Sequence, residues 1–255
     1  MKIINLIIYS NTTDVYKPMF DILNKYYSNY KNIKTYFISF DNNNEKFKNN
    51  DYYLDNNLLI FKGIESLVPG VLNKTLKALH YCKEFEYDYI VRTNISTIIN
   101  YNNLIKYLIN NPINFYGGGE NNILSWNGGG INDDTWYGTN FISGTSIILS
   151  KKCVNFIIEN ENKIIREIVD DVSLGILFRE HYNKYKPETI NSKYYIKTPI
   201  FIKDNKIDID RFINFINEKE ELIFYRNRTY NTDRQIDVFN MNIIYQILLN
   251  KINNN

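Results

Sequence analysis

Apolar residues in the first half of the chain follow two alternating patterns. Short continuous apolar runs, which are typical of buried strands, occur near residues 3–8 and 89–92. Between them, Met19, Leu23 and Tyr26 recur at a spacing near one helical turn, which is typical of an amphipathic helix. The resulting β-α-β-α-β order predicts an α/β fold with a mostly parallel central sheet flanked by helices. The expected strands are residues 1–10, 33–40, 58–61 and 89–92, and the expected helices are residues 14–30, 69–85 and 101–109.

The second half of the chain opens with two glycine triplets, at residues 117–119 and 128–130, which enclose a loop carrying Trp126. Because glycine permits tight turns and mobile backbone, we interpret this loop as a lid over a site. No repeat or linker-like segment interrupts the sequence, so we expect a single domain over residues 1–255. The remaining expected strands are residues 141–149, 194–202 and 222–225, and the remaining helices are residues 151–160, 170–179 and 236–252.

Composition narrows the class of protein. Hydrophobic residues make up 44% and charged residues 23% of the 255 residues, as in globular proteins with a sizeable core. A formal net charge of +2 gives no electrostatic reason to expect nucleic acid as a partner. No apolar run approaches the length of a membrane span, so we expect a cytoplasmic protein without one. Cys82 and Cys153 supply neither a disulfide framework nor a zinc cluster and are expected to be reduced thiols.

Polar side chains follow the expected strands, where α/β proteins bind their ligands. Ser10, Asn11 and Thr12 follow the first strand, and Arg92 stands at the end of a later one. These residues are candidate nucleotide ligands. The alternative is that the first three are ordinary turn residues and that Arg92 forms a structural salt bridge.

Two adjacent carboxylates, Asp170 and Asp171, open an expected helix. A carboxylate near a ligand can act as a general base on a hydroxyl group. Aspartate is also a common helix cap, so a structural role is the alternative. Both roles are compatible if Asp170 caps the helix and Asp171 carries the chemistry.

Four short motifs occur in a fixed order between residues 65 and 175. They are Lys74-Thr75 in an expected helix, Arg92-Thr93-Asn94-Ile95-Ser96 after a strand, Ser143-Gly144 ahead of Leu149-Ser150, and Asp170-Asp171-Val172 with Gly175 beyond. In this order the segment resembles the GT-A-fold glycosyltransferases, most nearly the β-1,3-galactosyltransferase and Fringe group. The resemblance outside this segment is one of element order only.

The resemblance implies transfer of a sugar from a nucleotide-diphosphate donor, with UDP-sugars favoured, to a hydroxyl of a glycan or glycoconjugate. Residues 1–110 would then bind the nucleotide sugar, and residues 111–255 would bind the acceptor and carry the catalytic residues Asp170 and Asp171. Asp171 matches the general base of the group, which implies inversion at the anomeric carbon. The implied donor ligands are Ser10, Asn11, Thr12, Lys74, Arg92, Asn94 and Ser96, and the implied acceptor ligands are Trp126, Trp136 and Gly144.

The chain departs from the group at its metal-binding element. Asn94, Ile95 and Ser96 stand where the group has three acids, and neutral side chains are poor ligands for Mn²⁺ or Mg²⁺. We therefore expect no cofactor and no metal site, although a divalent metal stays an alternative. Arginines suit phosphate oxygens, so the candidate replacements for the metal at the diphosphate are Arg226, Arg228 and Arg234. The alternative for this stretch is a solvated basic turn.

Two other functions remain open from the sequence. A binding module derived from a glycosyltransferase would hold a glycan or a nucleotide sugar without turning it over, and the missing acids favour it. A small-molecule hydrolase is disfavoured because the chain has no Gly-x-Ser-x-Gly motif and no paired histidines.

Overall fold

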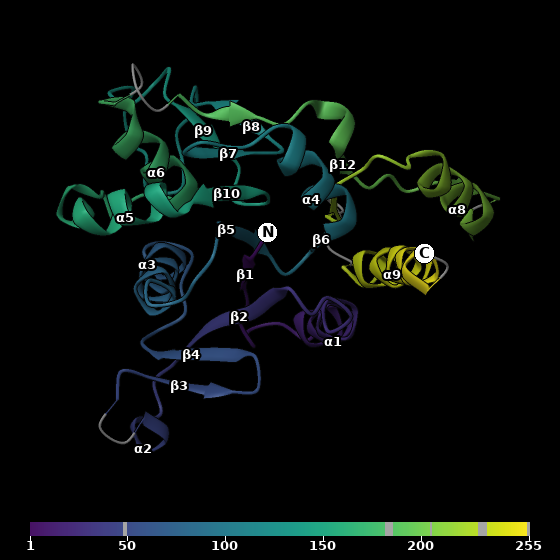
Figure 1. Ribbon diagram of the computed structural model, residues 1–255, viewed down its shortest axis with the longest axis horizontal. Coiled ribbons are helices and arrows are strands. Elements are labelled where there is room, and N and C mark those ends of the chain that lie inside the picture. The colour runs from purple at the N-terminus through teal and green to yellow at the C-terminus, as the bar shows by residue number, and fades with distance from the viewer. Residues whose placement is uncertain (48–49, 182–185, 205, 229–233, 254–255) are drawn as a thin grey trace. The chain divides into compact units, whose positions relative to one another are not determined.

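The computed structural model describes residues 1–47, 50–181, 186–204, 206–228 and 234–253 (Figure 1). The expected single domain is organised as two compact units that interleave along the chain. The first unit contains residues 1–10, 31–94 and 113–190, and the second contains residues 11–30, 95–112 and 191–255. The functional halves expected on either side of residue 110 stay a prediction.

An eight-stranded sheet forms the first unit, in the order β11-β7-β10-β5-β1-β2-β4-β3. The pairs β1/β2, β1/β5, β2/β4 and β7/β11 are parallel, while β10 and β3 run antiparallel to their neighbours. The prediction of an α/β fold with a large, mostly parallel sheet flanked by helices is confirmed. The strands are β1 (Ile3–Ile8), β2 (Ile33–Asp41), β3 (Tyr52–Asp55), β4 (Leu58–Lys62), β5 (Tyr89–Asn94), β7 (Tyr116–Gly118), β10 (Ile147–Ser150) and β11 (Glu188–Thr189).

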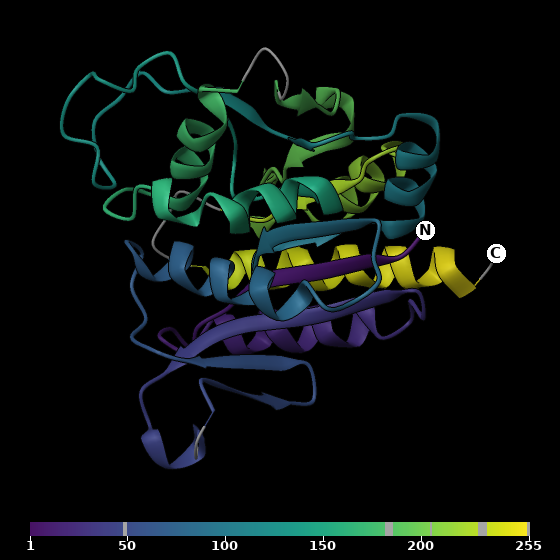
Figure 2. The same cartoon turned by 60° about the vertical axis from the view of Figure 1, so that its left-hand side comes forward.

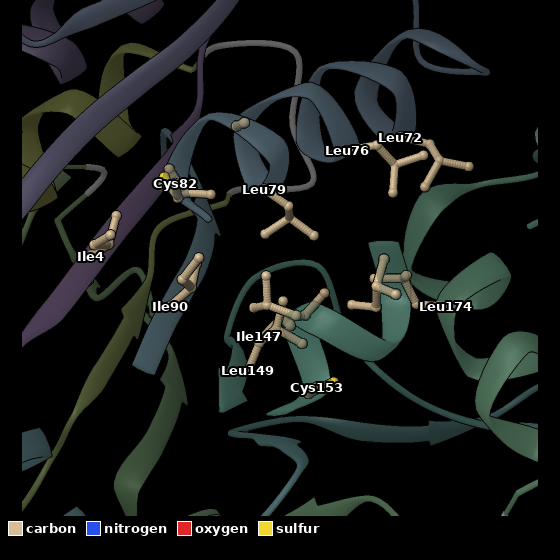
Figure 3. Packing of buried hydrophobic residues seen from close by; sticks show 14 of the residues in the cluster. Ile4, Leu72, Leu76, Leu79, Cys82, Ile90, Ile147, Leu149, Cys153 and Leu174 are labelled. Atoms are coloured by element: carbon tan, nitrogen blue, oxygen red, sulfur yellow. The ribbon is translucent and has the colours of Figure 1, made fainter. Parts of the chain in front are cut away.

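Helices α3 (Gly70–Cys82), α5 (Lys151–Glu159) and α6 (Asp170–Arg179) pack with this sheet around the main apolar core. Helix α3 contacts β1, β2 and β4, and α5 contacts β10 and β5. Figure 3 shows Leu76 and Leu79 of α3 pointing toward Leu174 of α6 and Ile147 of β10. Cys82 and Cys153 are buried free thiols in this core. The short helices α2 (Asn44–Phe47) and η1 (Glu161–Lys163) also belong to this unit.

The strand expected at residues 141–149 is wrong in one respect, because it is two strands in different sheets. Strand β9 (Asn140–Ile142) pairs with β8 (Asn121–Ile123), whereas β10 belongs to the large sheet. The chain turns between them, where the Ser146 amide donates to the Ser143 carbonyl oxygen at 3.1 Å. Strand β9 contacts α6, and a second apolar cluster including Phe141, Val172 and Ile176 lies there.

The two glycine triplets have different structural roles. Gly117 and Gly118 are part of β7, not of a loop, which corrects the expectation for the first triplet. A Cβ atom at Gly118 would overlap the backbone oxygen of Ser146, so glycine is needed there for close backbone packing. The second triplet has positive φ angles, from +57° at Gly129 to +131° at Gly128, as a tight turn requires. The lid itself stays a prediction.

The second unit combines helices with a three-stranded sheet in the order β12-β15-β6. Helix α9 contacts α1, α8 and β6, and a group of tyrosines including Tyr26, Tyr27 and Tyr101 packs in this unit. The strand expected at residues 194–202 is wrong, since β12 and β13 are separate short strands. The elements are α1 (Tyr16–Tyr27), β6 (Thr97–Ile99), α4 (Tyr101–Asn110), η2 (Ser192–Tyr194), β12 (Tyr195–Lys197), β13 (Ile202–Lys203), β14 (Lys206–Ile207), α8 (Ile209–Glu218), β15 (Phe224–Arg226) and α9 (Gln235–Asn253).

Side-chain caps begin several of these helices. Asn100 accepts from the Asn103 amide at α4, Ser150 from the Cys153 amide at α5, and Asp208 from the Arg211 amide at α8. Across the described ranges, no helix is both long enough and apolar enough to cross a membrane.

Candidate active site

A buried ion pair joins Arg92, on β5, to Asp170, the first residue of α6. The Arg92 Nη2 atom donates to the Asp170 carboxylate, and Nη1 donates to the Gly144 carbonyl oxygen at 2.6 Å. The exposed fraction is 4% for the Arg92 side chain and 10% for that of Asp170. Both terminal nitrogens of Arg92 are therefore engaged inside the first unit, and the salt bridge considered as its structural alternative is present.

Asp171 lies beside this pair and is held by backbone donors. Its Oδ2 atom accepts from the Gly144 amide at 2.9 Å, and its Oδ1 atom accepts from the Val172 amide at 2.9 Å. Burial, and then the neighbouring negative charge of Asp170, raise the pKa of Asp171 to about 6. A carboxyl group with this pKa can exchange a proton near neutral pH, which is what a general base requires.

The expected cap at the start of α6 is wrong in its detail. Val169 occupies the N-cap position, and it makes no side-chain hydrogen bond to the helix. Asp170 does not cap because its carboxylate is turned to Arg92. The two acids of the motif therefore have different partners, one a guanidinium and the other backbone amides.

Gly144 connects these residues because its carbonyl and its amide each bind one of them. A Cβ atom built at this position would overlap Arg92 Nη1 and lie 3.6 Å from Asp171 Oδ2. Glycine is therefore needed for the close approach of the loop to both side chains. The predicted contact of Gly144 with an acceptor stays a prediction.

Lys74, on α3, forms a second buried ion pair in the first unit. Its Nζ atom donates to Glu65 Oε2 and to the Tyr9 carbonyl oxygen, both at 2.7 Å. Only 1% of the Lys74 side chain is exposed, and burial is the largest cause that lowers its pKa. Glu65 also accepts from the Phe40 amide at 2.7 Å, so the pair ties α3 to the ends of β1 and β2.

In the second unit, Arg226 of β15 lies against Ser96. The Arg226 Nη1 atom donates to Ser96 Oγ, and the Asn227 amide donates to the Ser96 carbonyl oxygen at 2.8 Å. Both side chains are buried, with 7% of Arg226 and 2% of Ser96 exposed. A guanidinium therefore lies against the third residue of the Asn94-Ile95-Ser96 segment.

Positive charge gathers around Arg226. Burial lowers the pKa of Arg226 to about 10, and the nearby charges of Arg228 and Arg234 act in the same direction. Arg228 is exposed, while Arg234 donates to Asp237 Oδ2 at 2.8 Å. The alternative of a solvated basic turn fails for Arg226, which is buried, and stays open for Arg228.

The other predicted site residues have less defined surroundings. Ser10 is partly exposed, and Asn11 and Thr12 are exposed. Trp126 is 41% exposed, whereas Trp136 is half-buried against the cluster that contains Phe141. Asn94 ends β5 and is half-buried. Within the described part of the chain, no group of three or more His, Cys, Asp or Glu side chains is arranged to bind a metal ion.

Comparison with solved structures shows the fold. The chain is similar to a glycosyltransferase involved in the glycosylation of the major capsid of PBCV-1, with a TM-score of 0.50 and 8% identity over 94% of this chain and 99% of the other. The likeness shows a shared fold. No protein-family model matches the sequence, and no curated protein matches it.

Two other similar structures superpose less closely. The glycosyltransferase GlyE of Streptococcus pneumoniae TIGR4 has a TM-score of 0.46 and 11% identity over 98% of this chain. The bifunctional glycosyltransferase WbbM has a TM-score of 0.47 and 11% identity over 94% of this chain. The chain spans 63% of the length of GlyE and 49% of the length of WbbM.

Several residues that hold these clusters in place are not indicated by the sequence. Glu65 pairs with Lys74, and Asn227 contacts Ser96 while accepting from Thr198 at 2.9 Å. Each contact joins residues far apart in the sequence, and no local pattern indicates them. Lys74 alone gives a sequence signal, because it stands on a largely apolar face of α3. A buried ammonium group needs a partner of opposite charge, so this position predicts one.

Proposed function

We propose that the chain transfers a sugar from a nucleotide-diphosphate donor to an acceptor hydroxyl, with Asp171 as the general base. The observation that carries the proposal is the combination at Asp171 of a raised pKa and two backbone donors that fix its carboxylate. The fold supports the same class of enzyme, since the similar structure is that of a glycosyltransferase involved in capsid glycosylation.

The proposed chemistry is a single displacement. Asp171 accepts the proton of the acceptor hydroxyl while the hydroxyl oxygen forms a bond to the anomeric carbon of the donor. The bond from that carbon to the diphosphate oxygen breaks, and the electron pair leaves with the nucleoside diphosphate. Attack from the face opposite the leaving group inverts the anomeric configuration.

We propose further that arginines stabilise the departing diphosphate and that a divalent metal is not required. Negative charge develops on the leaving group, and preorganised positive charge lowers the energy of that state. A divalent cation at Ser96 would lie beside the guanidinium of Arg226, with neutral ligands around it, so these residues do not fit a metal. Arg226 and Arg228 are instead suited to phosphate oxygens.

The test of transfer compares the native chain with Asp171→Asn against a panel of nucleotide sugars, with release of nucleoside diphosphate as the readout. Loss of a general base should lower kcat by about 10²–10⁴-fold, while donor binding is retained. Asp210→Asn changes an exposed carboxyl on α8 and is the matched control. Turnover that survives Asp171→Asn would remove this residue from the mechanism.

The test of metal independence repeats the assay with Mn²⁺ and with EDTA, and adds Arg228→Ala. We expect turnover to persist in EDTA and the affinity for nucleoside diphosphate to fall in Arg228→Ala, with Arg228→Lys intermediate. Arg211→Ala, an exposed arginine on α8, is the control. A strict requirement for Mn²⁺ would contradict the proposed role of the arginines.

A binding module without turnover is the second candidate, and the neutral Asn94-Ile95-Ser96 segment favours it. Such a module would bind a nucleotide sugar equally well in the native chain and in the Asp171→Asn variant, and neither protein would release nucleoside diphosphate. UDP-sugars as donors, a glycan as acceptor and a cytoplasmic location remain parts of the proposal.

A further inference from the structure

A large hollow in the first unit lies away from Asp171, between α3 and the β4–β3 end of the sheet. Its volume is about 1230 Å³. This exceeds the roughly 300–1,000 Å³ of a typical small-molecule site. Figure 2 shows β3 and β4 at the lower end of the sheet, with α3 over the strands above them. The hollow can therefore hold a ligand of several linked rings.

Aromatic side chains supply much of its wall. They come from β2, β3, β4, the end of α3 and the segment just after α3. Among them, Tyr52 of β3 is 41% exposed. The Tyr52 ring is braced by Tyr81 and Phe61, with ring centroids 5.1 Å and 6.1 Å away. An exposed ring that its neighbours hold in place offers a flat apolar surface to a ligand. The aromatic lining residues are Phe40, Tyr52, Phe61, Tyr81 and Phe85.

Gly63 keeps the hollow open at the end of β4. A Cβ atom there would lie 2.6 Å from Cδ1 of the Phe40 ring, closer than real side chains approach. Any larger residue would displace the ring from its position in the wall. The shape of this part of the hollow therefore depends on the absence of a side chain.

Charged groups of both signs surround the aromatic wall. Lys62 and Lys77 contribute ammonium groups, and Asp51 and Glu84 contribute carboxylates. Within the described residues, none of these four side chains has an ion-pair partner. The balance of two positive and two negative groups favours neither an anion nor a cation as the ligand.

At one corner of the hollow, the polar and charged side chains already bind one another. Glu161 accepts from Arg166 Nη2 at 2.6 Å and lies 2.6 Å from His80 Nε2, while Arg166 Nη1 donates to Asn73 Oδ1. These groups form a closed network, so we assign recognition to the aromatic wall and to Lys62, Lys77, Asp51 and Glu84.

We propose that this hollow binds a neutral oligosaccharide. The ring C–H groups of a pyranose form an apolar face that stacks on an aromatic ring, and its hydroxyls both donate and accept hydrogen bonds. Ammonium and carboxylate groups around the exposed ring of Tyr52 match that chemistry. An apolar lipid would leave the same charges desolvated without partners. The site is separate from the proposed transfer site and does not require that the chain transfers sugar.

The test is binding of the labelled native chain to a printed array of neutral and acidic oligosaccharides, followed by titration of the best neutral glycan. Tyr52→Ala should weaken that binding about tenfold or more, as the loss of an aromatic anchor does. Tyr107→Ala removes a half-buried tyrosine of α4 outside the hollow and is the matched control. Lys77→Ala, at a half-buried position of α3, provides a second variant should Tyr52→Ala unfold.

The outcomes separate this site from the transfer site. Glycan binding that is lost in Tyr52→Ala or Lys77→Ala and retained in Asp171→Asn supports the proposal, whether or not the native chain shows turnover. No binding on the array overturns it. Binding only to acidic glycans, or binding unaffected by both variants in the hollow, also overturns it.

Discussion

The raised pKa of Asp171 has a consequence for stability that can be measured without knowing the substrate. The ordinary pKa of the group is 3.8, and in the folded chain it is about 6. The folded state therefore keeps a proton at pH values where the unfolded state has lost it. By linkage, the contribution of Asp171 to the free energy of unfolding is largest below pH about 4 and is lost as the pH rises to about 6.

The magnitude follows from the two pKa values. Their difference corresponds to about 3 kcal/mol, which is an upper limit for the destabilisation at pH 8. Asp171→Asn removes the charge and hence this dependence on pH. The stability of the variant relative to the native chain should therefore rise by up to about 3 kcal/mol between pH 4 and pH 8. With a urea m-value near 3 kcal/mol/M, this is a relative shift of about 1 M in the unfolding midpoint.

The assay is urea unfolding of both proteins at pH 4, 5, 6, 7 and 8, followed by fluorescence and circular dichroism. Comparing the two chains at each pH cancels the carboxyl groups that lie away from Asp171, which titrate alike in both. A relative stability that is flat with pH, or that favours the native chain at high pH, would refute the reasoning. Either result would mean that the hydrogen bonds from the Gly144 and Val172 amides at least offset burial, so that folding does not raise the pKa of Asp171.

Three further changes test the packing around the site. Asp170→Asn leaves the buried guanidinium of Arg92 without its anion and should lower the free energy of unfolding by about 3–5 kcal/mol, measured by urea titration. Gly144→Ala should cost about 1–3 kcal/mol, because the added methyl group overlaps Arg92 Nη1; an unchanged thermal midpoint would contradict that close approach. Lys74→Met should destabilise the chain by a similar amount to Asp170→Asn, and Lys74→Met with Glu65→Leu should recover part of the loss, as a double-mutant cycle would show.

The sequence predicts most of the regular elements because their apolar spacing is strong. The helix over residues 170–179 agrees with the structure at both ends, and β1, β2, β4 and β5 are found where their apolar runs predict them. Short strands are missed or merged. Strand β6 has three residues, and β9 and β10 are predicted as one run because a polar turn between two apolar segments resembles a single interrupted strand.

The sequence does not predict the long-range contacts at the site. The sequence allows Asp170 to cap the helix while Asp171 carries the chemistry; in the structure Asp170 pairs with Arg92 instead, and Asp171 accepts from backbone amides. Arg92 and Asp170 form an ion pair although they are 78 positions apart in the sequence. The same holds for Ser96 and Arg226, which are 130 positions apart. Such pairs follow from how the strands are ordered in space, and no local pattern encodes that order.

The interleaving of the two units constrains when each can form during synthesis. The first unit ends at residue 190, so its sheet can close before residues 191–255 leave the ribosome. The second unit needs those residues, because β15 and α9 belong to it. Until then β6 has no β15 to pair with, and Ser96 has no Arg226. The arginine cluster can therefore form only after the sheet of the first unit is complete, and a chain released after residue 190 but before residue 226 contains Asp171 in the first unit and lacks Arg226.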